Sequence, residues 1–250
     1  MRVAPFGMIP IHDDNPTATR PVVTIGLIAV NALVFLWQLT LTPSQQEMAI
    51  YAFGMIPAVL LQGVTLPPEI AGTPPVLTVV TSMFMHGGWM HLLGNMLYLW
   101  IFGNNVEDAC GHGRFLVFYL ACGVAAALAQ AFQDPSSTLP MVGASGAIGG
   151  VLGAYLLLHP HARVLVLIPI FFYMHVARIP ALLVLGLWFV IQFVSYAATP
   201  AGEGGVAYWA HIGGFIAGAV LILFIRRRGI PLFEGRSRPM PPPRRRGPWG

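Results

Sequence analysis

Long apolar stretches separated by short polar segments dominate this chain of 250 residues. A helix needs about 20 apolar residues to cross a bilayer, although one that begins below the membrane surface needs fewer. The stretches that meet this criterion are 22–41, 89–106, 114–132, 145–158, 181–198 and 207–225. The pattern therefore predicts an all-α polytopic membrane protein, a bundle of six transmembrane helices.

The composition supports this prediction. Hydrophobic residues make up 56% of the chain and charged residues 9%, which is too little charge to cover the surface of a water-soluble domain. Nucleic-acid binding, intrinsic disorder and a disulfide-rich scaffold are excluded for the chain as a whole, because each needs charge or cysteine that is missing here.

The positive charges indicate how the chain is oriented. All 13 are arginines, and the intervening loops 42–88, 133–144 and 199–206 contain none. Because positively charged segments stay in the cytoplasm, both termini are expected there. The apolar run 164–172 is interpreted as lying at the inner face, since a seventh span would move Arg226 to Arg228 outside.

We therefore divide the chain into three parts. Residues 1–21 are a cytoplasmic N-terminal segment, 22–225 form the six-helix core, and 226–250 are an Arg- and Pro-rich cytoplasmic tail that is expected to be disordered. The abundance of Arg, Ala and Pro, with no Lys, is typical of a GC-rich bacterial genome, so the expected location is a bacterial inner membrane.

Four polar residues are expected at similar depth. Counting helical rise from the inner end of each span places Ser145 and His211 roughly 8–9 Å below the outer surface, His91 roughly 6 Å and Asn95 roughly 12 Å below it. The fourth span is short, so non-helical backbone at 134–144 must lie at membrane depth, where it is tolerated only in a protein interior or a wet cavity. The sequence predicts a pocket that opens to the outside.

Glycines flank this pocket and continue down the helices. Gly143 and Gly146 surround Ser145 and permit a tight turn and close approach of a substrate backbone. Further along, small-xxx-small spacing relates Gly146 to Gly150 and Gly149 to Gly153 in one span, and Gly214 to Gly218 in another, which lets two helices pack backbone to backbone. Such packing would bring Ser145 and His211 within hydrogen-bonding reach, as a nucleophile and its general base require.

These residues resemble the rhomboid family of intramembrane serine proteases. GASG at 143–146 is similar to its nucleophile motif, AHIGGFIAG at 210–218 to its general-base motif, and HGGWMHLLGN at 86–95 to its HxxxxHxxxN motif. The similarity extends over about 22–225 and implies a rhomboid-like six-helix bundle.

The resemblance implies roles for individual residues. Ser145 corresponds to the nucleophile and His211 to the general base, while His91 and Asn95 help to hold the oxyanion and His86 supports the site. Some members place an aromatic ring against the base histidine, four residues after the serine, where this chain has Gly149. What orients His211 is left open.

The implied activity is hydrolysis of a peptide bond in or next to a transmembrane helix of another protein, by a Ser-His dyad. A helix shields its own peptide bonds, so we expect substrates with small or helix-breaking residues near the cleavage site. No acidic residue lies within a predicted span, and no HExxH motif occurs, so neither a metal nor another cofactor is expected. The sequence does not predict the oligomeric state.

Two alternatives remain. A six-span transporter would use the broken fourth helix as its substrate site, although the apolar lower halves of the fourth and sixth spans argue for a blind pocket. A catalytically inactive rhomboid-like protein that binds membrane helices is the other.

Overall fold

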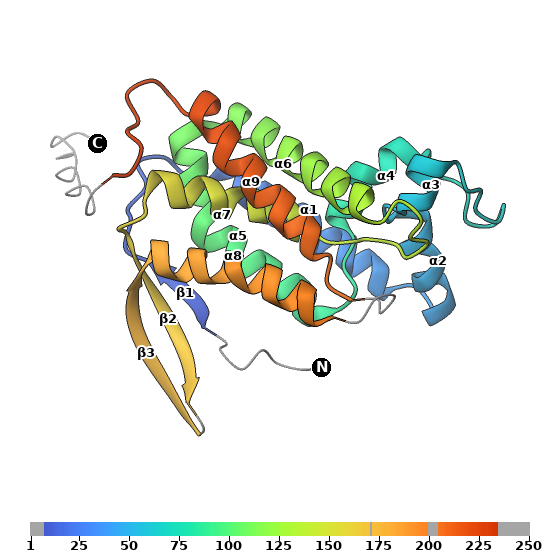
Figure 1. The fold of residues 1–250 in the computed structure, drawn as a ribbon, viewed down its shortest axis with the longest axis horizontal. Helices are drawn as coiled ribbons and strands as arrows, with labels where there is room; N and C mark the ends of the chain where they lie inside the picture. The colour runs from blue at the N-terminus through green and yellow to red at the C-terminus, as the bar shows by residue number, and fades with distance from the viewer. Residues whose placement is uncertain (1–7, 171, 200–204, 235–250) are drawn as a thin grey trace, which may run out of the picture.

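The computed structural model describes residues 8–170, 172–199 and 205–234. Figure 1 shows a bundle of helices with a small sheet at one end. Along the described chain the elements are β1 (Ile9–Asp13), α1 (Val22–Leu39), α2 (Pro43–Phe53), α3 (Pro57–Gln62), α4 (Pro75–Thr81), the 3-10 helix η1 (Ser82–Phe84), α5 (Trp89–Cys110), α6 (His112–Gln133), α7 (Ser145–Leu158), β2 (Arg163–Ile170), β3 (Tyr173–Pro180), α8 (Ala181–Ala198) and α9 (Tyr208–Ile225).

A helix occupies each stretch that the hydropathy pattern selects. In the described residues, α1, α6, α8 and α9 are long and apolar enough to cross a membrane. A fifth candidate span is the pair made by Pro75–Phe84 and α5, which bends by 81° at its break, and α7 is a shorter apolar helix of 14 residues. The prediction of a mostly helical, multi-pass membrane protein is confirmed.

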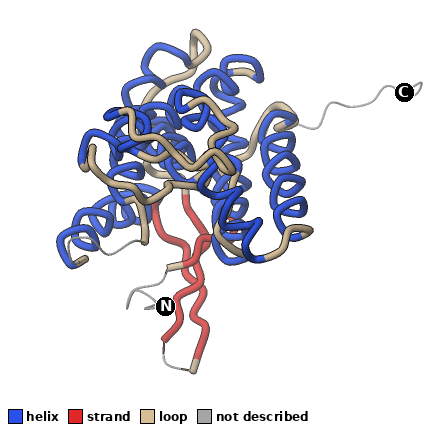
Figure 2. The backbone as a smooth tube through the Cα atoms, turned by 90° about the vertical axis from the view of Figure 1, so that its right-hand side faces the viewer, coloured by secondary structure: helices blue, strands red, loops and turns tan. Residues whose placement is uncertain are grey.

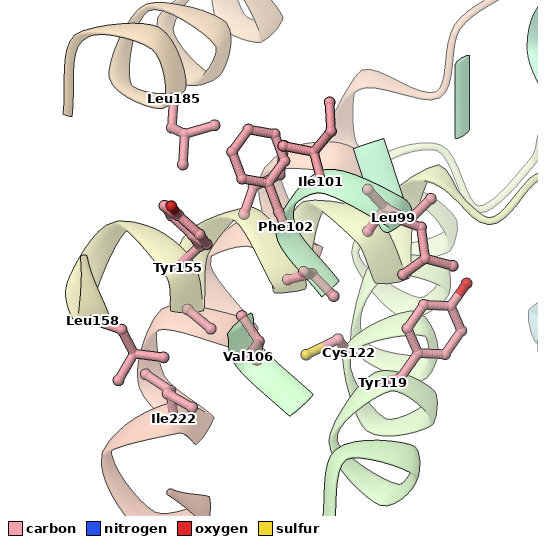
Figure 3. Close-up of a cluster of buried hydrophobic side chains, with 14 of the residues drawn as sticks. Leu99, Ile101, Phe102, Val106, Tyr119, Cys122, Tyr155, Leu158, Leu185 and Ile222 are labelled. Carbon is pink, nitrogen blue, oxygen red and sulfur yellow. The ribbon is translucent and has the colours of Figure 1, made fainter. Parts of the chain in front are cut away.

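The core is built around α7. Eleven of its 14 residues are buried, and it packs against α5, α6, α8 and α9. Figure 3 shows this core, where Tyr155 of α7 lies edge-on to Phe102 of α5 and Leu185 of α8 and Ile222 of α9 reach the same cluster. The helix that begins at Ser145 is therefore held on several sides.

The expectation of an all-α protein is wrong in one region. Residues 163–180, which include the apolar run assigned to the inner face, form an antiparallel hairpin that β1 extends to a three-stranded sheet in the order β1-β2-β3. A short apolar run fits a strand as well as a buried helix. Here Val164 and Val166 are fully buried against the helices. The buried positions are two residues apart, which is the spacing of a strand and not of a helix.

Part of the segment after α9 differs from expectation. Of the 226–250 segment expected to be disordered, residues 226–234 are placed: the backbone N–H groups of Phe233 and Glu234 donate to the carbonyls of Leu157 and Leu158 at the end of α7, at 2.7 and 2.9 Å. These bonds satisfy carbonyls that a helix end leaves without partners. Residues 235–250 lie outside the described part of the chain.

The N-terminal end of α1 is capped by a carboxylate from α5. Glu107 is fully buried and accepts hydrogen bonds from the backbone N–H of Val23 at 2.9 Å and from the backbone N–H and hydroxyl of Thr24, each at 2.7 Å. Its other neighbour is His112, whose Nδ1 lies 2.6 Å away. A negative charge at a helix N-terminus interacts favourably with the helix dipole.

Glu107→Gln should therefore destabilise the protein. An amide replaces one acceptor oxygen with a donor and faces N–H groups that also donate, so we expect a loss of about 2 kcal/mol in the free energy of unfolding. Thermal unfolding in detergent measures it. Glu47→Gln is the matched control because Glu47 is exposed. Equal midpoints for the two variants would contradict a capping role for Glu107.

A second buried carboxylate connects β1 to α7. The Tyr155 hydroxyl donates to Oδ2 of Asp13 at 2.6 Å, and only 5% of Asp13 is exposed. Burial raises the pKa of Asp13 from its ordinary value of 3.8 to about 6, against the opposing effects of the Tyr155 bond and of His12. The folded protein thus holds this proton more tightly than the unfolded chain does.

The free energy of unfolding should therefore fall as the pH rises. The contribution of Asp13 is complete below its unfolded pKa of 3.8 and is lost as the pH rises through about 6, so between pH 4 and 7 we expect a loss on the order of 2 kcal/mol. Melting temperatures across that range, for wild type and Asp13→Asn, isolate the effect. Identical pH slopes for the two proteins would rule it out.

Candidate active site

Ser145 and His211 form a hydrogen-bonded pair. Ser145 is the first residue of α7, His211 lies in the first turn of α9, and Nε2 of His211 is 2.8 Å from Oγ of Ser145. Ser145 is half-buried, whereas His211 is 9% exposed. A serine hydroxyl in contact with a sheltered imidazole is the arrangement that nucleophilic catalysis requires.

Close packing of α7 on α9 sets this distance. A Cβ added to Gly214 would lie 2.0 Å from the carbonyl oxygen of Gly146, and one on Gly218 would lie 1.9 Å from that of Gly150. A Cβ on Gly153 would likewise meet the carbonyl oxygen of Phe215, at 2.1 Å. Figure 1 shows the two helices side by side. All four glycines assigned to packing thus lie where the two backbones touch.

The chain approaches Ser145 through a loop with a positive-φ glycine. Residues 134–144 are non-helical, as the short α7 requires, and Gly143 has φ +123°. Its N–H donates to the carbonyl of Ser82 at 2.8 Å, and a Cβ at this position would lie 2.6 Å from Nε2 of His91. Gly146 is equally confined, because its Cβ would meet that of Ala126 at 2.6 Å. Larger residues would displace the loop or its neighbours.

The polar residues of α5 lie beside this loop. Nδ2 of Asn95 is 3.0 Å from Nε2 of His86, and the rings of His86 and His91 meet edge to face with centroids 5.1 Å apart. Gln38 of α1 holds the backbone of His86 by two hydrogen bonds of 3.0 Å, one donated and one accepted. The structure therefore brings His86, His91 and Asn95 together next to Gly143.

The residue that orients His211 is one that the sequence does not single out. Gln192 of α8 is 6% exposed, and its Oε1 lies 2.7 Å from Nδ1 of His211. Its amide nitrogen donates to the carbonyl of Trp188 at 3.0 Å, so the amide oxygen must face the imidazole. Nδ1 consequently carries the proton, which leaves the lone pair of Nε2 directed at Ser145.

An aromatic ring also contacts His211. Trp188 lies with its ring centroid 5.7 Å from that of His211, at an interplanar angle of 37°. The ring comes from α8, not from the position four residues after the serine. Gly149 stands at that position, and a Cβ there would approach the carbonyl oxygen of His211 to 2.9 Å. The absence of a side chain at Gly149 thus allows α9 to pack closely on α7, and Trp188 is the aromatic ring that contacts His211.

A cavity of about 1150 Å³ connects these groups. Its lining includes His91, Asn95, Ser145, Trp188, Tyr196 and His211. The loop 134–144 and the first turn of α9 border it as well. A chain segment that enters this cavity has access to the serine hydroxyl and to the amide of Asn95.

The chain matches one family of known proteins. The model of the rhomboid domain family matches residues 74–228, which is more than half of the chain and includes His86, His91, Asn95, Ser145 and His211. The chain belongs to the rhomboid family. Multi-pass insertion in a membrane and a relationship to named proteases follow from that membership.

The relatives come from several kinds of organism. The chain is 31% identical over 159 residues to rhomboid protein 1, mitochondrial, of Saccharomyces cerevisiae, covering 60% of this chain and 42% of that protein. It is 45% identical over 78 residues to rhomboid protease GluP of Bacillus subtilis (31% and 15%), and 36% identical over 165 residues to rhomboid-like protease 5 of Toxoplasma gondii (62% and 17%). The chain thus spans less than half the length of each of these relatives.

Proposed function

We propose that this rhomboid is an intramembrane serine endopeptidase that acts through a dyad of Ser145 and His211. The observation that carries the proposal is the 2.8 Å contact between Oγ of Ser145 and Nε2 of His211, on a histidine whose other nitrogen is bonded to Gln192. An inactive relative has no need to hold an imidazole in the tautomer that accepts a proton from serine.

The chemistry proceeds in two steps. As Oγ of Ser145 attacks the substrate carbonyl, its proton passes to Nε2 of His211, and the new C–O bond leaves a negative charge on the carbonyl oxygen. His211 then gives the proton to the departing amine as the C–N bond breaks. Water from the cavity hydrolyses the ester by the same route and regenerates Ser145.

The negative charge needs donors within the cavity. The N-terminus of α7, at Ser145, offers free backbone N–H groups and the positive end of the helix dipole. Asn95 and His91 lie next to the adjacent Gly143. His86 holds the Asn95 amide in place by the 3.0 Å contact between Nε2 and Nδ2. We assign Asn95 and His91 to the oxyanion and His86 to support of Asn95.

The substrate in this proposal is a transmembrane helix of another protein with small or helix-breaking residues near the cleaved bond. A helix shields its own peptide bonds, so it must unwind locally for Ser145 to reach the carbonyl carbon, and residues of low helix propensity reduce that cost. Relatives named as proteases support the class of reaction.

The proposed topology is six spans with both termini in the cytoplasm of a bacterium. All described arginines (Arg20, Arg114, Arg163, Arg178, Arg226, Arg227 and Arg228) lie at the end of the bundle where α1 begins and α9 ends. The positive-inside rule places that end in the cytoplasm, so the cavity with Ser145 opens to the other side.

A fluorophosphonate probe tests the proposed function directly. Detergent-solubilised wild type should become covalently labelled, whereas Ser145→Ala and His211→Ala should show no labelling, because the first lacks the nucleophile and the second the base. Cleavage of a transmembrane test substrate should be lost in the same variants. A folded wild type that resists the probe and leaves the substrate intact would overturn the proposal in favour of a helix-binding protein.

A further inference from the structure

The β2–β3 hairpin carries large apolar side chains that are exposed. Phe172 is 99% exposed, Tyr173 80% and Met174 57%, with Ile170 and Val176 close to half-exposed. An antiparallel hairpin in water normally has one polar face. Between 163 and 180 the ionisable residues other than Tyr173 are Arg163, His175 and Arg178. Contact with water on all sides would therefore leave an unusually large apolar patch uncovered.

One face of the hairpin begins as protein core and continues beyond it. Val164 and Val166 are fully buried against the helices, and alternate residues of a strand share a face. The next residues on that face are Ile168 and Ile170, and Ile170 pairs with Tyr173 across the hairpin. This face of the hairpin is therefore apolar both where the helices bury it and where it extends beyond them.

The position of the hairpin points to the lipid. β3 ends at Pro180 and α8 begins at Ala181, and Figure 1 shows the hairpin and α8 diverging from this point. Figure 2 shows the strands projecting beyond the outline of the helices. The outward side chains of α8 are apolar and exposed, among them Leu183 at 59% and Val194 at 61%. The hairpin thus continues the lipid-facing surface of α8.

The charges are arranged for a membrane interface. Arg163 and Arg178 lie near the root of the hairpin, where Asp14 accepts a hydrogen bond from the backbone N–H of Arg163 at 2.7 Å, and no Asp or Glu occurs between residues 159 and 198. Arginines at the root and an aromatic and aliphatic tip are typical of elements that bind anionic headgroups and insert below them. We propose that the hairpin is a membrane anchor, with its tip inserted in the leaflet that surrounds the inner end of α8.

An environment-sensitive label tests this anchor. The fluorophore NBD is attached at Tyr173→Cys and, as a matched control, at His161→Cys, which is exposed in the turn before β2. The native thiols Cys110 and Cys122 are buried. Wild type treated with the same reagent measures any labelling of these two thiols. Each protein is reconstituted into vesicles of phosphatidylcholine containing phosphatidylglycerol, and quenching by a doxyl-labelled lipid is compared with quenching by aqueous iodide.

We expect the label at 173 to emit at shorter wavelength and to be quenched several-fold more strongly by the lipid quencher than by iodide, with the reverse order at 161. Stronger quenching by iodide at 173 would overturn the proposal. So would a blue-shifted label that neither quencher reaches and that becomes exposed on dilution with lipid, because a second copy of the chain would then cover the hairpin. Ser145→Ala protein should give the same result, so the anchor and the proposed chemistry are tested independently.

Discussion

Gly218→Ala should unfold or separate the helix pair that carries the dyad, although the substitution adds a single methyl group. The Cβ would lie 1.9 Å from the carbonyl oxygen of Gly150 and 2.5 Å from its Cα, so the obstacle is backbone and no side chain can move aside. Overpacking in a core costs about 1–3 kcal/mol where side chains can adjust, and we expect at least about 3 kcal/mol here.

The same substitution should reduce activity beyond its effect on stability. Gly218 lies two turns from His211, and separation of α9 from α7 would lengthen the 2.8 Å contact to Ser145. A displacement of about 1 Å at a reacting pair costs on the order of 100-fold in rate. Thermal unfolding in detergent and the rate of fluorophosphonate labelling of the folded fraction measure the two effects.

Gly186→Ala is the control for this experiment. Gly186 also lies inside an apolar helix, α8, but a Cβ there meets nothing within 4 Å. Alanine in place of a mid-helix glycine then gains about 0.5–1 kcal/mol from reduced freedom of the unfolded chain. If Gly218→Ala were as stable as Gly186→Ala, the backbone contact between α7 and α9 would not exist in the protein.

The positions of the helices could be predicted from the sequence because the bilayer imposes a length and an apolar composition on each of them. Helical rise then relates Ser145 to His211 in depth, since both lie near the ends of helices whose other ends are marked by polar residues. The small-xxx-small glycines of these two helices indicate which faces can approach closely. These three signals together predict the pair of residues that the structure brings to 2.8 Å.

The partner of His211 could not be predicted in the same way. Gln192 stands in a helix that is apolar around most of its circumference, so its sequence does not reveal which side faces α9. A polar amide in an apolar span is a signal that a hydrogen-bond partner exists, but not which one. The hairpin at 163–180 was missed for a related reason: its residues are apolar on both faces, and only packing against the bundle distinguishes a strand from a buried helical segment.

Gln192→Leu should slow catalysis strongly while the fold is preserved. Leucine fills a similar volume but cannot accept the proton of Nδ1, so His211 is free to rotate or to carry its proton on Nε2, where it cannot act as a base toward Ser145. Loss of the group that fixes the tautomer in a serine protease triad costs about 10⁴-fold. For a neutral amide in place of a carboxylate we expect roughly 100- to 1000-fold, which corresponds to about 3–4 kcal/mol.

The measurement is kcat and KM for a transmembrane substrate, together with the rate of probe labelling. A positioning role predicts that kcat falls while KM stays within a few-fold, because Gln192 contacts His211 and Trp188 through its amide and not the substrate. Gln192→Glu is the informative second variant: it restores an acceptor for Nδ1–H and should recover much of the rate lost in Gln192→Leu. Gln192→Leu with normal kcat, or with a raised KM alone, would show that the amide does not orient the base.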